Sequence, residues 1–175
     1  MRKGDWFQTH TGVQFWPMDP RADEVRIDDI ARGLAMQCRF NGHVKEFYSI
    51  AEHSVRVSHV VPPEHALWGL LHDAAEAYIG DMVRPLKTQM PAFRECEAAI
   101  MAVICERFGM TMPEPPEVKV ADNVLLMTER RDLLLYQKPW THRADPLPDE
   151  IEPWTWQKAE AEFLSRFAML KKEAP

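Results

Sequence analysis

Nothing in this sequence suggests a secreted or membrane-spanning protein. Its only cysteines are Cys38, Cys96 and Cys105, an odd number without a CxxC pair, so it lacks the framework of a disulfide-stabilised secreted domain. No run approaches the ~18 apolar residues of a transmembrane helix, and residues 1–10 lack the apolar stretch of a signal peptide. We therefore expect a cytoplasmic protein with reduced thiols and no membrane association.

The chain also lacks an excess of positive charge. Its 27 acidic residues outnumber 21 Lys and Arg and give a formal net charge of −6, so no general basic field is available to hold long nucleic acid. A small nucleotide can still bind through a few local cations. With 175 residues, 46% of them hydrophobic, the chain is long enough for its own core, and we expect a single domain over residues 1–175.

The spacing of apolar residues predicts an all-α fold. Apolar positions recur at helical intervals, and proline or glycine separates the segments. Gly12 lies between two short extended pieces and predicts a small hairpin or arm within residues 1–20. We expect a bundle of about six helices, with a core at about 25–135 and a C-terminal helix at about 154–172. The helices before it are expected at about 27–38, 49–61, 63–79, 93–108 and 118–135.

Two histidines are predicted to meet at the centre of this bundle. Residues 49–52 match the S-x-x-E capping box and begin a helix that carries His53 on its apolar stripe. Pro62-Pro63 makes a short bend, and a short connection places two helices antiparallel. His53 lies nine residues before Pro62, and His72 lies ten after it. At ~1.5 Å per residue, both lie about 14 Å from the bend, so the imidazoles reach similar heights on facing helices.

Carboxylates accompany these histidines. Asp73 adjoins His72, and Asp122 lies on the inward stripe of a later helix, where an unpaired carboxylate would be costly. We predict that His53, His72, Asp73 and Asp122 bind one divalent metal; nitrogen and oxygen ligands suit Mn²⁺, Co²⁺, Fe²⁺ or Zn²⁺. Glu76 shares the face of His72 and would orient or deprotonate a bound water. The alternative is that these groups form buried polar pairs, with Glu76 in a flanking salt bridge.

These residues resemble the HD-domain phosphohydrolase superfamily over roughly residues 25–135, most densely at 49–87. The similarity is carried by SIAEHS at 49–54, HDAAEAYIGD at 72–81, PLK at 85–87 and AD at 121–122. Within the superfamily they look most like the YfbR-like 5′-deoxynucleotidases and the small phage deoxynucleoside triphosphohydrolases, including those specific for dATP. The resemblance implies an HD-domain helical bundle that holds one divalent metal.

The resemblance also implies an activity. Metal-bound water would attack the α-phosphorus of a deoxynucleotide and yield a nucleoside with either phosphate or triphosphate. A triphosphate substrate would bring additional Mg²⁺. Glu76 would position the water, and Asp81 would lie near the leaving group or sugar. The alternative for Asp81 is a turn residue after Gly80.

Substrate contacts are implied for Arg39 and Lys87 at the phosphate and for Phe40 at the sugar. The alternatives are that Arg39 is a solvated arginine at a helix end, that Lys87 is an ordinary surface lysine and that Phe40 packs in the core. The segment 40–43 replaces a Trp-Pro sequence of the YfbR-like enzymes, which leaves base preference and phosphate number open. Within it, His43 is either a substrate contact or a structural loop histidine. Spacing indicates no role for four other histidines, namely His10, His59, His65 and His142.

Two further functions compete with this hypothesis. The protein could be a catalytically silent nucleotide-binding regulatory module, against which the presence of Glu76 argues. It could also be a cyclic-nucleotide phosphodiesterase, although the GYP signature of cyclic-dinucleotide phosphodiesterases is absent. We also expect a homo-oligomer, because six tryptophans and a proline-rich tail leave apolar surface to cover.

Overall fold

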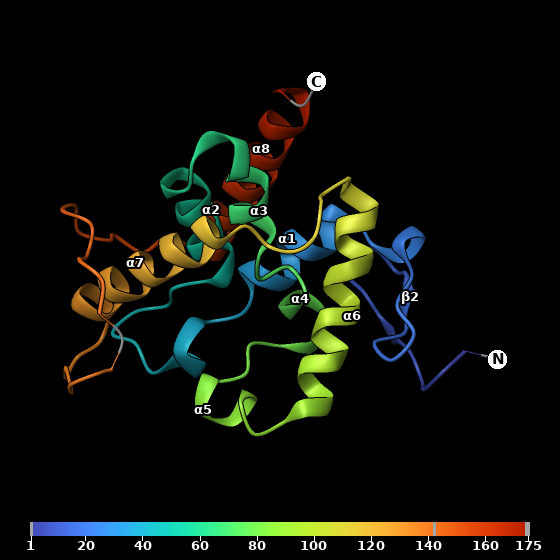
Figure 1. Ribbon diagram of the computed structural model, residues 1–175, viewed down its shortest axis with the longest axis horizontal. Helices are drawn as coiled ribbons and strands as arrows, with labels where there is room; N and C mark the ends of the chain where they lie inside the picture. Colours follow the sequence, from blue (N-terminus) through green and yellow to red (C-terminus); the bar gives the residue numbers. More distant parts are fainter. Residues whose placement is uncertain (1, 142, 174–175) are drawn as a thin grey trace.

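The computed structural model describes residues 2–141 and 143–173, and most of these lie in helices (Figure 1). His142 lies outside the described residues. The elements in chain order are β1 (Phe7–Gln8), β2 (Gln14–Phe15), η1 (Ala22–Glu24), α1 (Ile27–Ala35), η2 (Arg39–Gly42), α2 (Ile50–Val60), η3 (Pro63–His65), α3 (Ala66–Leu71), α4 (Glu76–Ile79), α5 (Arg84–Lys87), α6 (Pro91–Phe108), α7 (Pro116–Leu133) and α8 (Trp156–Glu173). The predicted all-α fold with a small N-terminal hairpin is confirmed. Among the described residues, no helix is both long and apolar enough to cross a membrane.

The hairpin packs against the helical part of the molecule. Strands β1 and β2 are antiparallel, and the turn between them contains Gly12 at a φ of +85°, a conformation that favours glycine. Phe15 is fully buried, and its ring stacks on Tyr78 of α4 with ring centroids 4.0 Å apart. The hairpin therefore covers the side of the bundle formed by α1 and α4.

Helix α2 lies at the centre of the bundle and packs against α1, α3, α7 and α8 (Figure 1). Ser49 caps it, because its hydroxyl accepts a hydrogen bond from the Glu52 N–H at 3.0 Å. The four helices packed against it contribute fully buried side chains, namely Ile30, Leu34, Leu70, Leu71, Leu125 and Phe163. This packing excludes water from the inner face of α2, where His53 has no exposed surface.

The predicted helix at 63–79 is wrong, because it breaks at His72. Helix α3 ends at Leu71, and the next bonds join residues three apart, as from the Glu76 N–H to the Asp73 carbonyl at 2.9 Å. An α-helix would pair the Gly69 carbonyl with the Asp73 N–H. That carbonyl instead accepts from Nδ1 of His72 at 2.9 Å. The His72 side chain thus competes with the backbone for the Gly69 carbonyl, and it does so at the point where α3 ends.

Two other details of the fold also differ from the prediction. Helix α1 ends at Ala35 rather than near Cys38, and Arg39 lies in the separate turn η2. Residues 80–92, where no helix is predicted, contain the short helix α5. Arg39 is therefore placed by a tight turn with its own geometry and not by the end of a helix.

Gly69 sets the spacing between α2 and α3. A Cβ at this position would lie 3.0 Å from both the Ser58 Cα and the Val61 Cγ2. We predict that Gly69→Ala destabilises the protein by about 1–3 kcal/mol, the usual effect of overpacking. Glycine-to-alanine in an open helix gains about 1 kcal/mol, so the sign of the change separates close packing from helix propensity. Urea unfolding measures it, and an unchanged or higher stability would contradict the close approach.

Candidate metal centre

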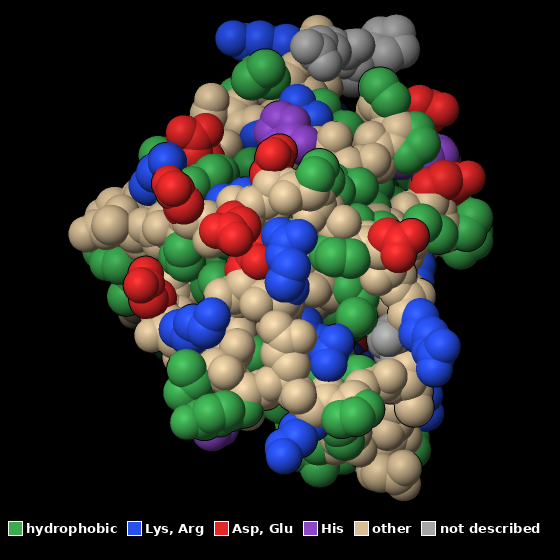
Figure 2. Space-filling view, turned by 90° about the vertical axis from the view of Figure 1, so that its left-hand side faces the viewer, with side chains coloured by type: hydrophobic (Ala, Val, Ile, Leu, Met, Phe, Trp, Pro, Cys, Tyr) green, Lys and Arg blue, Asp and Glu red, His purple; other side chains and the backbone are tan. Residues whose placement is uncertain are grey.

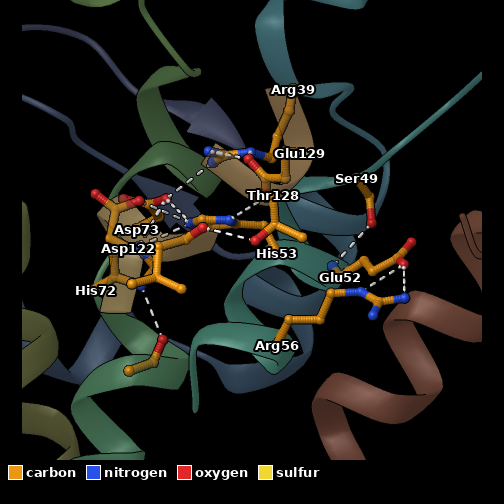
Figure 3. A network of polar contacts seen from close by, with 12 residues as sticks. Arg39, Ser49, Glu52, His53, Arg56, His72, Asp73, Asp122, Thr128 and Glu129 are labelled. Carbon is orange, nitrogen blue, oxygen red and sulfur yellow. Dashed lines mark hydrogen bonds and ion pairs between the residues drawn. The ribbon is translucent and has the colours of Figure 1, made fainter. Parts of the chain in front are cut away.

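His53, His72 and Asp122 lie together at the centre of the bundle (Figure 3). One ligand atom from each lies within 4.8 Å of the other two. The Nε2 atoms of the histidines are 3.3 Å apart, and Nε2 of His53 is 3.3 Å from Oδ1 of Asp122. One group each therefore comes from helix α2, from the end of α3 and from helix α7. The two histidines lie at similar heights, as their spacing from Pro62 predicts.

Asp73 completes a set of four side chains. Its Oδ2 lies 3.2 Å from Nε2 of His72 and 3.7 Å from Nε2 of His53. The tight turns after Leu71 place these neighbouring residues so that both side chains border one point. Three of the four predicted ligands, His53, His72 and Asp122, thus form one cluster, and Asp73 borders it through its contacts with both histidines.

Both histidines have their other ring nitrogen occupied. Nδ1 of His53 lies 2.6 Å from Oε1 of Glu129, and Nδ1 of His72 lies 2.9 Å from the Gly69 carbonyl. A carboxylate and a carbonyl are acceptors, so each Nδ1 donates its proton. When the imidazoles are neutral, this arrangement leaves the Nε2 lone pairs free and directed at the shared point, as in histidines that bind metals.

Glu129 is a site residue that the sequence prediction lacks. It is fully buried, and its Oε2 accepts hydrogen bonds from Nε and Nη2 of Arg39 at 3.2 and 3.1 Å. Nη1 of the same arginine lies 3.6 Å from Oδ2 of Asp73. Glu129 follows Asp122 by seven residues, close to two helical turns. That spacing places both on one face of α7, and it is the signal that could have identified Glu129.

Glu76 lies beside the cluster in a buried position. Its Oε1 is 3.5 Å from Nζ of Lys87, which also pairs with Glu97. Its Oε2 is buried without a hydrogen-bond partner among the described residues. Burial, together with the Asp73 and Asp81 carboxylates, raises the pKa of Glu76 well above its ordinary value. The structure thus joins Glu76 and Lys87 in one pair at the edge of the site.

Three other predicted site residues make fewer contacts with the cluster, namely Asp81, Phe40 and His43. Burial raises the pKa of Asp81, and the backbone N–H of this residue donates to the Gln37 amide at 3.1 Å. Phe40 is half-buried at a φ of +55°, which is uncommon for a bulky residue. The Arg39 guanidinium lies 5.4 Å from the centre of its ring. His43 is exposed, and among the described residues no contact joins its side chain to the four-residue cluster.

Buried charges shift the proton affinities of the cluster. Burial lowers the pKa of His72, but the Asp73 carboxylate outweighs it and raises the pKa to about 9. For His53, burial and Arg39 lower the pKa, and the Glu129 and Asp122 carboxylates raise it to a net increase. Burial raises the pKa of Asp122, but the two imidazoles outweigh it and hold it below its usual range. The Asp122 carboxylate therefore stays ionised, and positive charge beside it stabilises that state.

The donor set and its charge fit a divalent cation. The carboxylates of Asp73 and Glu129 lie against the Arg39 guanidinium, and the carboxylate of Asp122 lies against Nε2 of His53. Lys119 reaches Oδ2 of Asp122 at 2.5 Å but is itself solvent-exposed. With both histidines neutral, the buried part therefore carries two excess negative charges. A divalent metal would balance them, and without metal the two imidazoles can do so by binding protons.

We predict that, with EDTA present, the protein loses stability between pH 6.5 and 8.5. The pKa of His72, about 9 in the folded state, exceeds the unfolded value of about 6.5, so its contribution is complete below pH 6.5 and falls as pH rises toward 9. The slope reaches about 1.4 kcal/mol per pH unit for each such histidine. Urea unfolding at pH 6.5 and at pH 8.5 measures this change in the free energy of unfolding. His72→Gln should reduce the slope, and equal slopes for both proteins would contradict the assignment.

Comparison with known proteins identifies relatives without a named activity. No family model matches the chain. The sequence is 43% identical over 128 residues to the uncharacterized protein YfdR of Escherichia coli K12, covering 73% of this chain and 72% of that protein. It is 30% identical over 163 residues to an uncharacterized protein of Rhodobacter capsulatus, covering 85% of this chain and 83% of that protein. The chain therefore belongs to the family of the uncharacterized protein YfdR.

Proposed function

We propose that this protein is a metal-dependent phosphohydrolase that acts on deoxynucleotides. The observation that carries the proposal is the clustering of His53, His72 and Asp122, with Asp73 beside both histidines. Two excess negative charges at that point and the two free Nε2 lone pairs support a divalent metal, for which we name Mn²⁺, Co²⁺, Fe²⁺ or Zn²⁺. The resemblance to HD-domain phosphohydrolases supports the reaction class.

A divalent metal at this position would polarise a phosphoryl oxygen and lower the pKa of a water. Glu76 is the residue suited to take the proton of that water. Its carboxylate is buried beside the cluster, its Oε2 has no described partner, and its raised pKa makes it bind a proton more tightly than an exposed glutamate does. Lys87, 3.5 Å away, opposes this rise in pKa by its positive charge.

Arg39 is suited to stabilise charge on the phosphoryl oxygens. Its guanidinium is held by Glu129 with Nη1 turned toward Asp73, so one edge lies against the cluster. A preorganised donor of this kind favours the charge that develops in the transition state. Phe40 beside it would contact the sugar, and Trp140 lies next to Phe40, with ring centroids 6.5 Å apart.

Lys and Arg side chains gather over part of one face of the molecule. Figure 2 shows the face that carries the C-terminal end of α7 and the loop after it. Most Lys and Arg side chains lie over the lower half of this view, whereas Asp and Glu lie mostly above. A local basic region of this kind lets a phosphate-bearing ligand approach a protein whose net charge is −6. Assembly into a homo-oligomer stays a prediction.

The reaction class is tested by a product panel. We expect purified protein with Mn²⁺ or Co²⁺ to convert at least one deoxynucleoside mono- or triphosphate to the nucleoside, with phosphate or triphosphate as the second product. Chromatography of the products separates the two outcomes, and cyclic nucleotides are included as further substrates. Tight binding of a nucleotide without turnover of any would favour the silent regulatory module instead.

Glu76→Gln tests the role of the general base. We expect kcat to fall by about 10²–10⁴-fold, the usual contribution of a positioned base, with Mn²⁺ affinity unchanged because Glu76 is not among the four ligands. Glu97→Gln is the matched control, since Glu97 also pairs with Lys87 but lies outside the cluster. Equal losses of kcat in both variants would show that only the lysine pairing matters and would exclude Glu76 as the base.

A further inference from the structure

Glu129 uses its two oxygens for two different parts of the site. Oε1 lies 2.6 Å from Nδ1 of His53, and Oε2 accepts both hydrogen bonds from Arg39. The residue has no exposed surface. Figure 3 shows it between the two side chains, on the side of His53 away from Asp73 and Asp122. A carboxylate that served only to neutralise Arg39 could offer both oxygens to the guanidinium, and this one does not.

The contact with His53 has a consequence for the metal site. Because Oε1 accepts the Nδ1 proton, the neutral ring carries its lone pair on Nε2, the atom that lies 3.3 Å from both the His72 imidazole and Asp122. The other tautomer would place a proton on Nε2, which cannot then bind a metal. A carboxylate behind a histidine also makes the ring a stronger donor.

The contact with Arg39 aligns the second part of the site. Both bonds from Arg39 go to Oε2, through Nε and Nη2, and this leaves Nη1 directed at Asp73, 3.6 Å away. Arg39 lies in η2, a turn with positive φ at Phe40 and Asn41. Two hydrogen bonds to Glu129 therefore hold the direction of its side chain.

We propose that Glu129 is a positioning residue that sets the tautomer of His53 for metal binding and, with the same carboxylate, the direction of Arg39. This inference rests on the proposed function. The Glu129→Gln variant separates these two roles from the effect of burying a polar side chain. The amide has one acceptor oxygen, and the other group is a donor, so it can satisfy His53 or Arg39 but not both. We expect Mn²⁺ affinity to fall about 10–100-fold, the usual effect of removing such a partner.

Glu52 provides a matched control. It is also fully buried, its Oε1 accepts from Nε and Nη2 of Arg56 at 3.0 and 2.7 Å, and its Oε2 accepts from the Trp154 N–H at 2.8 Å. It therefore holds one arginine and one N–H, as Glu129 does, but contacts no predicted metal ligand through its side chain among the described residues. We expect Glu52→Gln to lower stability in urea while Mn²⁺ affinity stays at the wild-type value.

The experiment measures Mn²⁺ binding by calorimetry on the wild type and both variants. Weaker binding in Glu129→Gln alone supports the inference. Equal affinity in all three proteins would overturn it and leave the proposed metal site intact, whereas absence of Mn²⁺ binding in the wild type would refute both. If Glu129→Gln does not fold, ¹⁵N NMR of the wild type with Zn²⁺ decides. The proton is expected on Nδ1 of His53, and a metal on Nδ1 would contradict the inference.

Discussion

The rest of this structure depends on the pairing of buried charges around His53. Placing an ion in a protein interior costs several kcal/mol, and the whole stability of a domain is only about 5–15 kcal/mol. Asp73, Asp122 and Glu129 can therefore stay ionised in the bundle only if positive charge and hydrogen bonds meet them at close range. Arg39 supplies one charge, and the two imidazoles or a divalent metal supply the others. This requirement explains why so many polar groups of the core converge on one point.

Helix α2 connects this point to the remainder of the fold. Glu52 and His53 are consecutive, so their side chains leave the helix about 100° apart. Glu52 binds Arg56 and the Trp154 N–H, which ties the start of the C-terminal segment to α2, and His53 faces Glu129 and Asp122 on α7. The same turn of α2 thus positions both the C-terminal segment and the metal centre. A shift of α2 would disturb both, which is why close packing at Gly69 bears on the site.

Much of this arrangement follows from the sequence, because its signals are local and periodic. The S-x-x-E pattern begins α2 at Ile50, Ser49 caps it as predicted, and the Pro62-Pro63 bend sets the heights of His53 and His72. One half of the capping box differs, since the Glu52 carboxylate binds Arg56 and the C-terminal segment. The four predicted ligands meet in the structure, while their binding of a metal stays a prediction.

Other features could be read from the sequence only in part or not at all. The end of α3 at Leu71 coincides with a bond from the His72 side chain to a backbone carbonyl, which no periodicity reveals. The turn at 39–42 requires positive φ at Phe40, a residue that rarely adopts it, although Asn41-Gly42 does signal a turn. Glu129 had a usable signal in its seven-residue distance from Asp122. Its burial alone was unpredictable, because glutamate on a helix is usually solvated.

Anomalous diffraction from crystals soaked in Mn²⁺ tests the central claim most directly. The account predicts one strong peak within bonding distance of His53 Nε2, His72 Nε2 and the carboxylates of Asp73 and Asp122, with His53 Nδ1 still against Glu129. A map in which these side chains are dispersed, or in which they cluster around no ion, would contradict it.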